Sequence, residues 1–425
     1  MVLRWFAAGC LQTKQHFRRI VGYEYLWVLK ANTDTGGMMK ITDVQACVIG
    51  RNEAHSGGSV WTFVRVYTDA GIVGTGECNS AGPYGSRFGN KEQVLALKPL
   101  LVGQDPLRIG PLYETMRQRC RYSGGSSAPT TFALTGIENA LFDIAGKALG
   151  VPVHQLLGGK FRDQVRLYAD CHAGETYEPA AYAEKALSVL AEGYTAVKFD
   201  VDHASPGKLD AYSMSLTARE MSHVISLIRS TREAIGYDVD LAIDCHGQFD
   251  MGSAITLARA VEDLRLMWLE EPVPAENDDA LARVRAATST RICTGENHYT
   301  RFDFRQLLER AAVDVVMPDL AKAGGFIEGR RIAEMADTYY VPVAPHNVSS
   351  PLGMMAACQL VAAIPNFLVL EFHGREIPWW EDLCDGDKPF IREGWMTVSD
   401  RPGIGVELND QVARSLLWGG DQYFD

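Results

Sequence analysis

Short apolar segments recur between residues 164 and 373, and each ends at a polar or charged residue. Segments this short and apolar throughout are typical of strands buried on both faces. Stretches with helical spacing, such as Ala254–Asp263 and Gly329–Asp337, lie between them. The pattern therefore predicts alternating strands and helices. The eight expected strands are Gln164–Asp170, Thr195–Asp200, Asp238–Asp244, Leu266–Glu270, Thr290–Glu296, Val313–Asp319, Val341–His346 and Phe367–Glu371.

The interval between these segments is regular. Asp244 and Glu270 are 26 residues apart, and so are Glu270 and Glu296, which leaves room for a strand, a helix and two loops. Eight such units predict an α/β fold of the modified TIM-type (β/α) barrel. The alternative is an open doubly wound sheet, which usually has a Gly-rich first turn. No GxGxxG follows a strand in this chain.

The part of the chain before the barrel has a different pattern. Ile41–Gly50 and Trp61–Glu77 predict a meander of strands, and helices such as Thr131–Leu149 follow. The Gly-, Ser- and Asn-rich segments Arg51–Ser59 and Cys78–Asn90 have no strand character and are expected to be loops. These elements indicate an α+β capping domain.

The expected organisation has three parts. Residues 1–38, rich in Arg and Lys and poor in acids, are interpreted as an extension without a part in the chemistry. An α+β capping domain at 39–163, completed by 374–425, precedes a barrel at 164–373.

Composition narrows the classes of partner. A formal net charge of −12 argues against nucleic acid, which binds to basic surfaces. The nine cysteines are dispersed and form no CxxC, as expected of reduced thiols in a cytoplasmic protein. No apolar run approaches the roughly 18 residues of a membrane helix, so a membrane partner is not expected.

Acidic residues at three successive strand ends suggest a metal site. The carboxyl ends of barrel strands meet at one mouth, where Asp244, Glu270 and Glu296 would repel one another unless a cation binds. Because no Cys or His cluster has zinc spacing, all-oxygen ligation favours Mg²⁺, with Mn²⁺ as a second possibility. The alternative is that each acid pairs with a nearby Lys or Arg.

Histidines at the same mouth are candidate acid and base groups. His346 ends a strand one unit after Asp319, which would orient the imidazole and stabilise its protonated form. His246 follows Asp244 by two residues, so both side chains would lie on the same side of an extended segment. Lys198 and Asp200 show the same spacing and would either face the mouth or form a buried ion pair.

At this point the motifs resemble a known family. The chain resembles the enolase superfamily, in particular its mandelate racemase subgroup, from about residue 39 to residue 410. The motifs in order are Ile243-Asp244, Trp268-Leu269-Glu270-Glu271-Pro272, Gly295-Glu296-Asn297, Pro318-Asp319 with Gly324-Gly325, Pro345-His346 and Leu370-Glu371.

The resemblance implies a capping domain whose loops select substrate, and Mg²⁺ bound by Asp244, Glu270 and Glu296. Many members carry Lys-x-Lys on the second barrel strand, with the second Lys as a base; here Lys198-Phe199-Asp200 replaces it. Asp244-Cys245-His246-Gly247 resembles the Asp-x-His-Gly of acid-sugar dehydratases such as galactonate and mannonate dehydratases.

These features lead to a hypothesis of sugar-acid dehydration to a 2-keto-3-deoxy acid. His346, oriented by Asp319, would remove the C2 proton, and His246 would protonate the departing 3-hydroxyl. Glu371 would hydrogen-bond the substrate carboxylate, and Lys198 would add positive charge there. Mg²⁺ would bind that carboxylate and stabilise the resulting enediolate.

Alternatives stay open at this stage. The roles of the two histidines are exchangeable. A racemase, epimerase or cycloisomerase would use the same site, and a non-catalytic sugar-acid-binding protein is a rival from another class. The resemblance also implies a symmetric homo-oligomer.

Overall fold

The structure is a computed structural model and describes residues 39–51, 59–78, 87–121, 128–173, 177–202 and 212–424. Lys40–Asp425 forms one compact unit. The expected extension at 1–38 lies outside the described residues, as do the centres of the expected loops Arg51–Ser59 and Cys78–Asn90. One part of the second loop differs from expectation, since Arg87–Asn90 belongs to a helix.

A ring of parallel strands confirms the expected barrel. Each neighbouring pair from β10 through β4 to β9 is parallel. An isolated pair of bridges at Val343, to Val316 and Phe367, closes the ring between β9 and β10. The strands are β4 (Gln164–Cys171), β5 (Ala196–Asp200), β6 (Asp240–Asp244), β7 (Trp268–Glu270), β8 (Ile292–Thr294), β9 (Val315–Val316) and β10 (Leu370–Phe372).

The seventh expected strand, Val341–His346, is reduced to the bridges at Val343. Pro342 and Pro345 have no backbone N–H, so this segment cannot donate at every position of a ladder. Val343 and Ala344 supply the donors instead, to Asn366 and Val316 at 2.9 and 3.0 Å. The segment keeps its place in the ring but not regular strand geometry.

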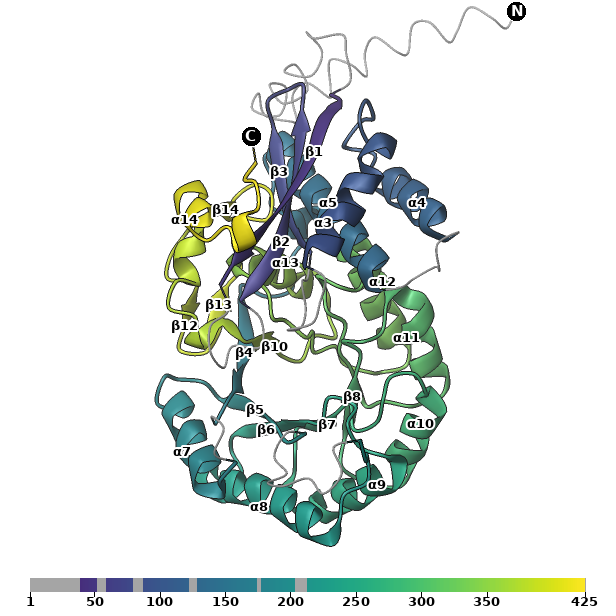
Figure 1. Ribbon diagram of the computed structural model, residues 1–425, viewed down its shortest axis with the longest axis vertical. Coiled ribbons are helices and arrows are strands. Elements are labelled where there is room, and N and C mark those ends of the chain that lie inside the picture. Colours follow the sequence, from purple (N-terminus) through teal and green to yellow (C-terminus); the bar gives the residue numbers. More distant parts are fainter. Residues whose placement is uncertain are drawn as a thin grey trace, which may run out of the picture. The chain divides into compact units, whose positions relative to one another are not determined.

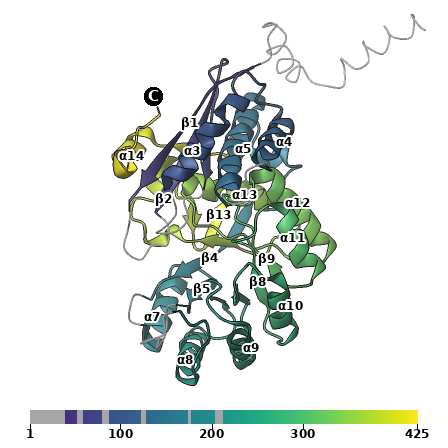
Figure 2. The ribbon, with the colours of Figure 1, turned by 45° about the vertical axis from the view of Figure 1, so that its right-hand side comes forward.

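Helices cover the outside of the ring (Figures 1 and 2). Several begin at side-chain caps, as at Thr217, which forms a capping box with Glu220, and at Asp250. None in the described ranges has the length and apolar composition of a membrane span. The helices are α7 (Pro179–Leu190), α8 (Ala218–Ile235), α9 (Met251–Ala260), η3 (Glu262–Leu264), α10 (Asp278–Ala286), α11 (Thr300–Glu309), α12 (Gly325–Thr338) and α13 (Pro351–Ala362).

The inside of the barrel is packed rather than open. Tyr168 and Trp268 meet edge to face, with ring centroids 5.5 Å apart, and small residues such as Ala196, Ala242 and Ala344 fill the space around them. Along β6 and β7, members of this apolar cluster precede the polar strand ends Asp244 and Glu270.

An antiparallel sheet and its helices precede the barrel, as expected. Strands β1, β2 and β3 pair in that order. The elements are β1 (Ile41–Gly50), β2 (Val60–Thr68), β3 (Val73–Cys78), α3 (Arg87–Leu97), η1 (Lys98–Leu100), α4 (Ile109–Cys120), α5 (Ala128–Leu149) and α6 (Val153–Leu156).

The C-terminal segment contacts both parts. Leu417 bridges Ile49 of β1, whereas β13 pairs with β4 at the barrel edge. We propose that the chain divides into a capping part, made of residues 39–163 and 374–425, and a barrel made of residues 164–373. The elements of this segment are η4 (Gly374–Glu376), η5 (Glu381–Leu383), β11 (Cys384–Asp385), β12 (Ile391–Arg392), β13 (Trp395–Thr397), β14 (Glu407–Leu408), α14 (Asp410–Ser415) and η6 (Trp418–Gly420).

A buried carboxylate joins the capping part to the barrel. Glu138 of α5 accepts hydrogen bonds from the backbone N–H groups of Phe326 and Ile327, at 2.9 and 2.8 Å, in the first turn of α12. Gly324 and Gly325 both have positive φ, and a Cβ at Gly325 would overlap the Glu138 carboxylate. The Gly-Gly pair of the sequence motif is therefore explained by this close approach.

The stability of the protein should depend on the ionisation of Glu138. Burial raises its pKa to about 8, against about 4.3 in an unfolded chain. The folded state then holds the proton more tightly, so this group's contribution to stability is present at low pH and is lost as pH rises through that window. Between about pH 5 and pH 8.5, the free energy of unfolding measured in urea should fall more in the wild type than in Glu138→Gln. Equal losses in the two proteins would contradict this assignment.

Candidate active site

The carboxyl ends of the strands bring acidic side chains together at one mouth of the barrel. In the parallel register, Asp200 lies beside Asp244, and Asp244 lies beside Glu270. Residues paired in register project to the same face of a sheet. Asp244 and Glu270 are both almost fully buried. Adjacent carboxylates without solvent require positive charge close by.

Lys198 supplies part of that charge. Its Nζ lies 3.0 Å from Asp244, 3.2 Å from Glu270 and 2.7 Å from Glu371, and its side chain is 3% exposed. Burial disfavours the charged amine, but the carboxylates, Glu270 foremost, raise the pKa of Lys198 well above its ordinary value. The residue therefore stays protonated. The partners of Lys198 are thus the carboxylates at the neighbouring strand ends rather than Asp200.

One ammonium does not neutralise the group. Burial raises the pKa of Glu270 well above its ordinary value, and repulsion from Asp244 raises it further. Its Oε2 accepts from the indole N–H of Trp268 at 3.0 Å, which fixes the side chain. A divalent cation between these carboxylates would relieve the repulsion, and an all-oxygen donor set suits Mg²⁺. The residues present therefore fit such an ion.

Glu296 stands on the far side of this group. Its Oε2 lies 2.7 Å from Nε2 of His346 and 3.5 Å from Nζ of Lys322, while Asn297 donates to its Oε1 at 2.9 Å. Burial alone would raise its pKa, but Lys322 and His346 hold the pKa of Glu296 well below its ordinary value. It is an ionised carboxylate facing the mouth.

Two groups of three side chains in the described ranges have ligand atoms within 4.8 Å of one another. One contains Asp200, Asp244 and His246; the other contains Asp170, His172 and His373. Glu270 and Glu296 belong to neither group. The structure thus contains an acidic and imidazole-bearing cluster suited to a divalent metal ion.

His346 and Asp319 form the expected pair. Nδ1 of His346 lies 2.7 Å from Oδ2 of Asp319, and the backbone N–H of Ala321 donates to the other carboxylate oxygen at 2.7 Å. Asp319 fixes the ring so that Nε2 is directed at Glu296. Burial and Lys322 act to lower the pKa of His346, but the carboxylates around it raise the value to about 10.

His246 lies at the mouth, but its backbone conformation differs from the extended one that the sequence predicts. Its φ is +44°, so the segment is not extended and strand alternation does not apply. Its backbone N–H donates to Asp244 Oδ1 at 2.9 Å, and its Nδ1 lies 3.2 Å from Asp202 Oδ2. Chiefly because of Asp244, the pKa of His246 is raised to about 12. The imidazole is held in its protonated form.

Glu371 is fully buried beneath the mouth. It accepts from the backbone N–H of Asn347 at 2.9 Å and pairs with Lys198. Trp380 is buried against Phe372 and donates to the carbonyl of Ser349. These contacts place both side chains in supporting positions.

Several ionisable residues at the mouth were not predicted as site residues from the sequence. Asp170 ends the first expected strand, so the rule that selected Asp244 also applied to it. His373 follows Glu371 by two residues, the same spacing that selects His246 after Asp244. Lys322, three residues after Asp319, has no spacing signal, and only its position in the structure identifies it.

Comparison with known families gives matches to both parts of the chain. Residues 51–158 match the family model described as mandelate racemase / muconate lactonizing enzyme, N-terminal domain. Residues 181–412 match the model described as enolase C-terminal domain-like.

Individual relatives cover nearly the whole chain. A D-xylonate dehydratase of Haloferax volcanii is 44% identical over 91% of each chain. A D-gluconate dehydratase of Thermoproteus tenax is 32% identical over 88% of this chain and 73% of its own. The crystal structure of a mandelate racemase/muconate lactonizing enzyme-like protein from Rubrobacter xylanophilus superposes with a TM-score of 0.86 at 42% identity, covering 92% of this chain and 100% of that one. The chain belongs to the mandelate racemase / muconate lactonizing enzyme family of the enolase superfamily.

Proposed function

We propose that this protein is an acid-sugar dehydratase, a hydro-lyase that converts a sugar acid into a 2-keto-3-deoxy acid. One observation carries the proposal: two histidines, His346 and His246, stand at the same mouth, each beside a carboxylate. Elimination of water needs one group to accept a proton and another to donate one. The dehydratase names of the relatives support the same reaction class.

Asp244, Glu270 and Glu296 are the residues we propose to hold a divalent cation, Mg²⁺ in the first place and Mn²⁺ as the alternative. The burial of Asp244 and Glu270, the repulsion between them and the oxygen-only donors of all three residues support this assignment. When bound, the cation supplies positive charge that stabilises the substrate carboxylate as the adjacent proton leaves.

The chain's own residues carry the proton transfers. Nε2 of His346 takes the proton from C2 while Asp319 holds Nδ1 and the ring orientation. The ring must first lose the proton that Glu296 and the other carboxylates hold on it, and a cation bound at Glu296 would lower the pKa of His346 from about 10 by offsetting that negative charge. The C2–H electron pair first moves toward the carboxylate to give an enediolate, and it then returns to form the C2–C3 double bond as the C3–O bond breaks. His246 delivers its proton to the departing hydroxyl, which leaves as water, and the resulting enol becomes the keto acid. Exchange of the C2 proton in D₂O distinguishes the reverse assignment of the two histidines.

Lys198 and Glu371 would act as positioning residues. Glu371 pairs with Lys198 and accepts from the backbone N–H of Asn347, and in this proposal it acts on the substrate carboxylate through Lys198. Lys198 then supplies the positive charge that the substrate carboxylate meets.

The function is tested by supplying sugar acids to the metal-free protein with and without added Mg²⁺. D-xylonate is the first substrate because of the relative that is 44% identical, and D-gluconate follows. We expect Mg²⁺-dependent formation of a 2-keto-3-deoxy acid, with one deuterium at C3 when the reaction runs in D₂O. Deuterium at C2 of recovered or epimerised substrate, with no keto acid, would establish the racemase or epimerase alternative instead.

A further inference from the structure

A second cluster of ionisable side chains lies at the ends of β4 and β10. Asp170 is the penultimate residue of β4, and His172 follows that strand directly. His373 is the first residue after β10, which pairs with β4 through Phe372 and Ala169. Two paired strands therefore hold the three side chains in fixed positions. None of them belongs to the proposed dehydration machinery.

The distances in this cluster are those of ligands that share an ion. Nε2 of His373 lies 3.0 Å from Oδ2 of Asp170 and 3.3 Å from Nε2 of His172, and the two ring centroids are 5.3 Å apart. Two imidazoles bound through Nε2 to one tetrahedral Zn²⁺ would have nitrogens about 3.3 Å and centroids about 5.2 Å apart. A linear N–H···N bond of the same length would separate the centroids by about 5.6 Å.

Hydrogen bonds alone satisfy the cluster poorly. Nε2 of His373 carries at most one hydrogen, yet it has two neighbours within reach. Oδ1 of Asp170 is buried and has no hydrogen-bond partner among the described residues, and the Asp170 side chain is 6% exposed. A buried polar atom left in this state costs about 1–3 kcal/mol, whereas a carboxylate oxygen directed at a cation does not.

The surroundings resemble those of a metal site in two further respects. Nδ1 of His172 lies 3.9 Å from Asp200 Oδ2, and metal-binding imidazoles commonly have a carboxylate behind the other ring nitrogen. Lys198, whose charge acts on Asp170, is already shared among three other carboxylates. Burial and the neighbouring Asp170 raise the pKa of Asp200 well above its ordinary value, as expected where carboxylates crowd together without a cation.

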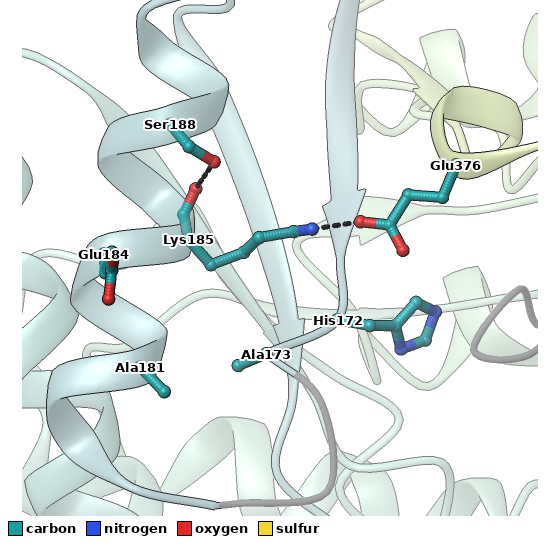
Figure 3. Close-up of a pocket in the computed structure, with 7 residues that line it drawn as sticks. All are labelled: His172, Ala173, Ala181, Glu184, Lys185, Ser188 and Glu376. Atoms are coloured by element: carbon teal, nitrogen blue, oxygen red, sulfur yellow. Dashed lines mark hydrogen bonds and ion pairs between the residues drawn. The ribbon is translucent and has the colours of Figure 1, made fainter.

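A solvent path leads to the cluster. His172 lines a cavity of about 480 Å³ between the end of β4, helix α7 and the segment that contains Glu376. Figure 3 shows the His172 ring on one wall, with the ion pair of Lys185 and Glu376 beside it. An ion would therefore have access without opening of the barrel.

We propose that Asp170, His172 and His373 form a second metal site, which binds a divalent transition-metal ion of the zinc and cobalt class. Two imidazoles and one carboxylate favour such an ion over Mg²⁺. Three protein ligands leave a coordination position for water or for an oxygen of a bound molecule.

The test uses Co²⁺ as the probe, because its visible absorption reports coordination. Full-length protein is stripped with a chelator, held in excess Mg²⁺ to occupy the oxygen-rich site, and titrated with Co²⁺. We expect about one Co²⁺ per chain with the intense absorption of low-coordinate, nitrogen-bound cobalt. His373→Gln and Asp170→Asn should weaken this binding by about 100-fold or more.

Two control variants locate the ion. His154→Gln alters a buried histidine beside Asp400, outside the mouth, and should leave the Co²⁺ spectrum unchanged. Glu296→Gln removes a ligand of the oxygen-rich site and should also leave it unchanged. X-ray absorption at the cobalt edge of the wild type, which needs no variant, should show imidazole scattering. A wild type that binds no Co²⁺, or a spectrum lost in Glu296→Gln but kept in His373→Gln, would overturn the proposal.

Discussion

Replacement of His346 by asparagine should lower kcat by about 10²- to 10⁴-fold, the usual contribution of a general base. Asparagine preserves a donor toward Asp319 but has no group that accepts the C2 proton. KM and Mg²⁺ affinity should change much less, because His346 contacts Glu296 without being a proposed ligand. Steady-state kinetics with the best substrate from the screen, alongside calorimetric Mg²⁺ titration, measures both quantities.

Hydrogen–deuterium exchange at C2 of the substrate in D₂O shows which histidine is the base and which is the acid. The same experiment is the control for the His346→Asn prediction. If His346 removes the proton, His346→Asn should abolish deuterium incorporation at C2 of recovered substrate. His246→Asn should block loss of water yet retain that exchange. The opposite pattern would assign the base role to His246, and exchange retained in both variants would remove both histidines from that role.

Lys198→Met should reduce the free energy of unfolding by about 3–5 kcal/mol, because it leaves Asp244, Glu270 and Glu371 buried without their common cation. If a divalent ion binds between Asp244 and Glu270, added Mg²⁺ should restore part of this loss. A ligand present at 100 times its Kd stabilises the folded state by about 2.7 kcal/mol. Urea unfolding with and without Mg²⁺ measures the recovery.

Lys147→Met is the matched control for this prediction. Lys147 also lies between two carboxylates, at 2.7 Å from both Asp143 and Glu407, but outside the mouth. Its replacement should destabilise the protein, and Mg²⁺ should stabilise that variant no more than the wild type. An equal Mg²⁺ effect on Lys198→Met and Lys147→Met would argue against a cation at the strand ends.

The barrel was predictable because one physical constraint acts repeatedly along the chain. A strand covered on both faces must be apolar until it leaves the sheet, so polar residues such as Asp244 and Glu270 mark its end. The equal intervals then identify the topology, and the topology brings distant residues to one mouth. The pairing of His346 with Asp319 followed from neighbouring strands in the same way.

Other features depend on information that spacing does not contain. The left-handed backbone of His246 places its side chain by a local hydrogen bond to Asp244, not by strand alternation. The prolines at 342 and 345 remove ladder donors, so a strand of apolar appearance becomes a single bridging residue. Convergence of Asp170, His172 and His373 requires knowing that β10 pairs with β4 and closes the ring.

The contact of Glu138 with the first turn of α12 has a consequence for modular exchange between relatives. A chimera that joins the capping part of one protein to the barrel of another inherits the carboxylate from one parent and the Gly324-Gly325 pair from the other. A mismatched pair either leaves the backbone N–H groups of Phe326 and Ile327 without their acceptor or drives a Cβ into the carboxylate. Recombination that transfers substrate-selecting loops should therefore retain both members of this contact from compatible parents.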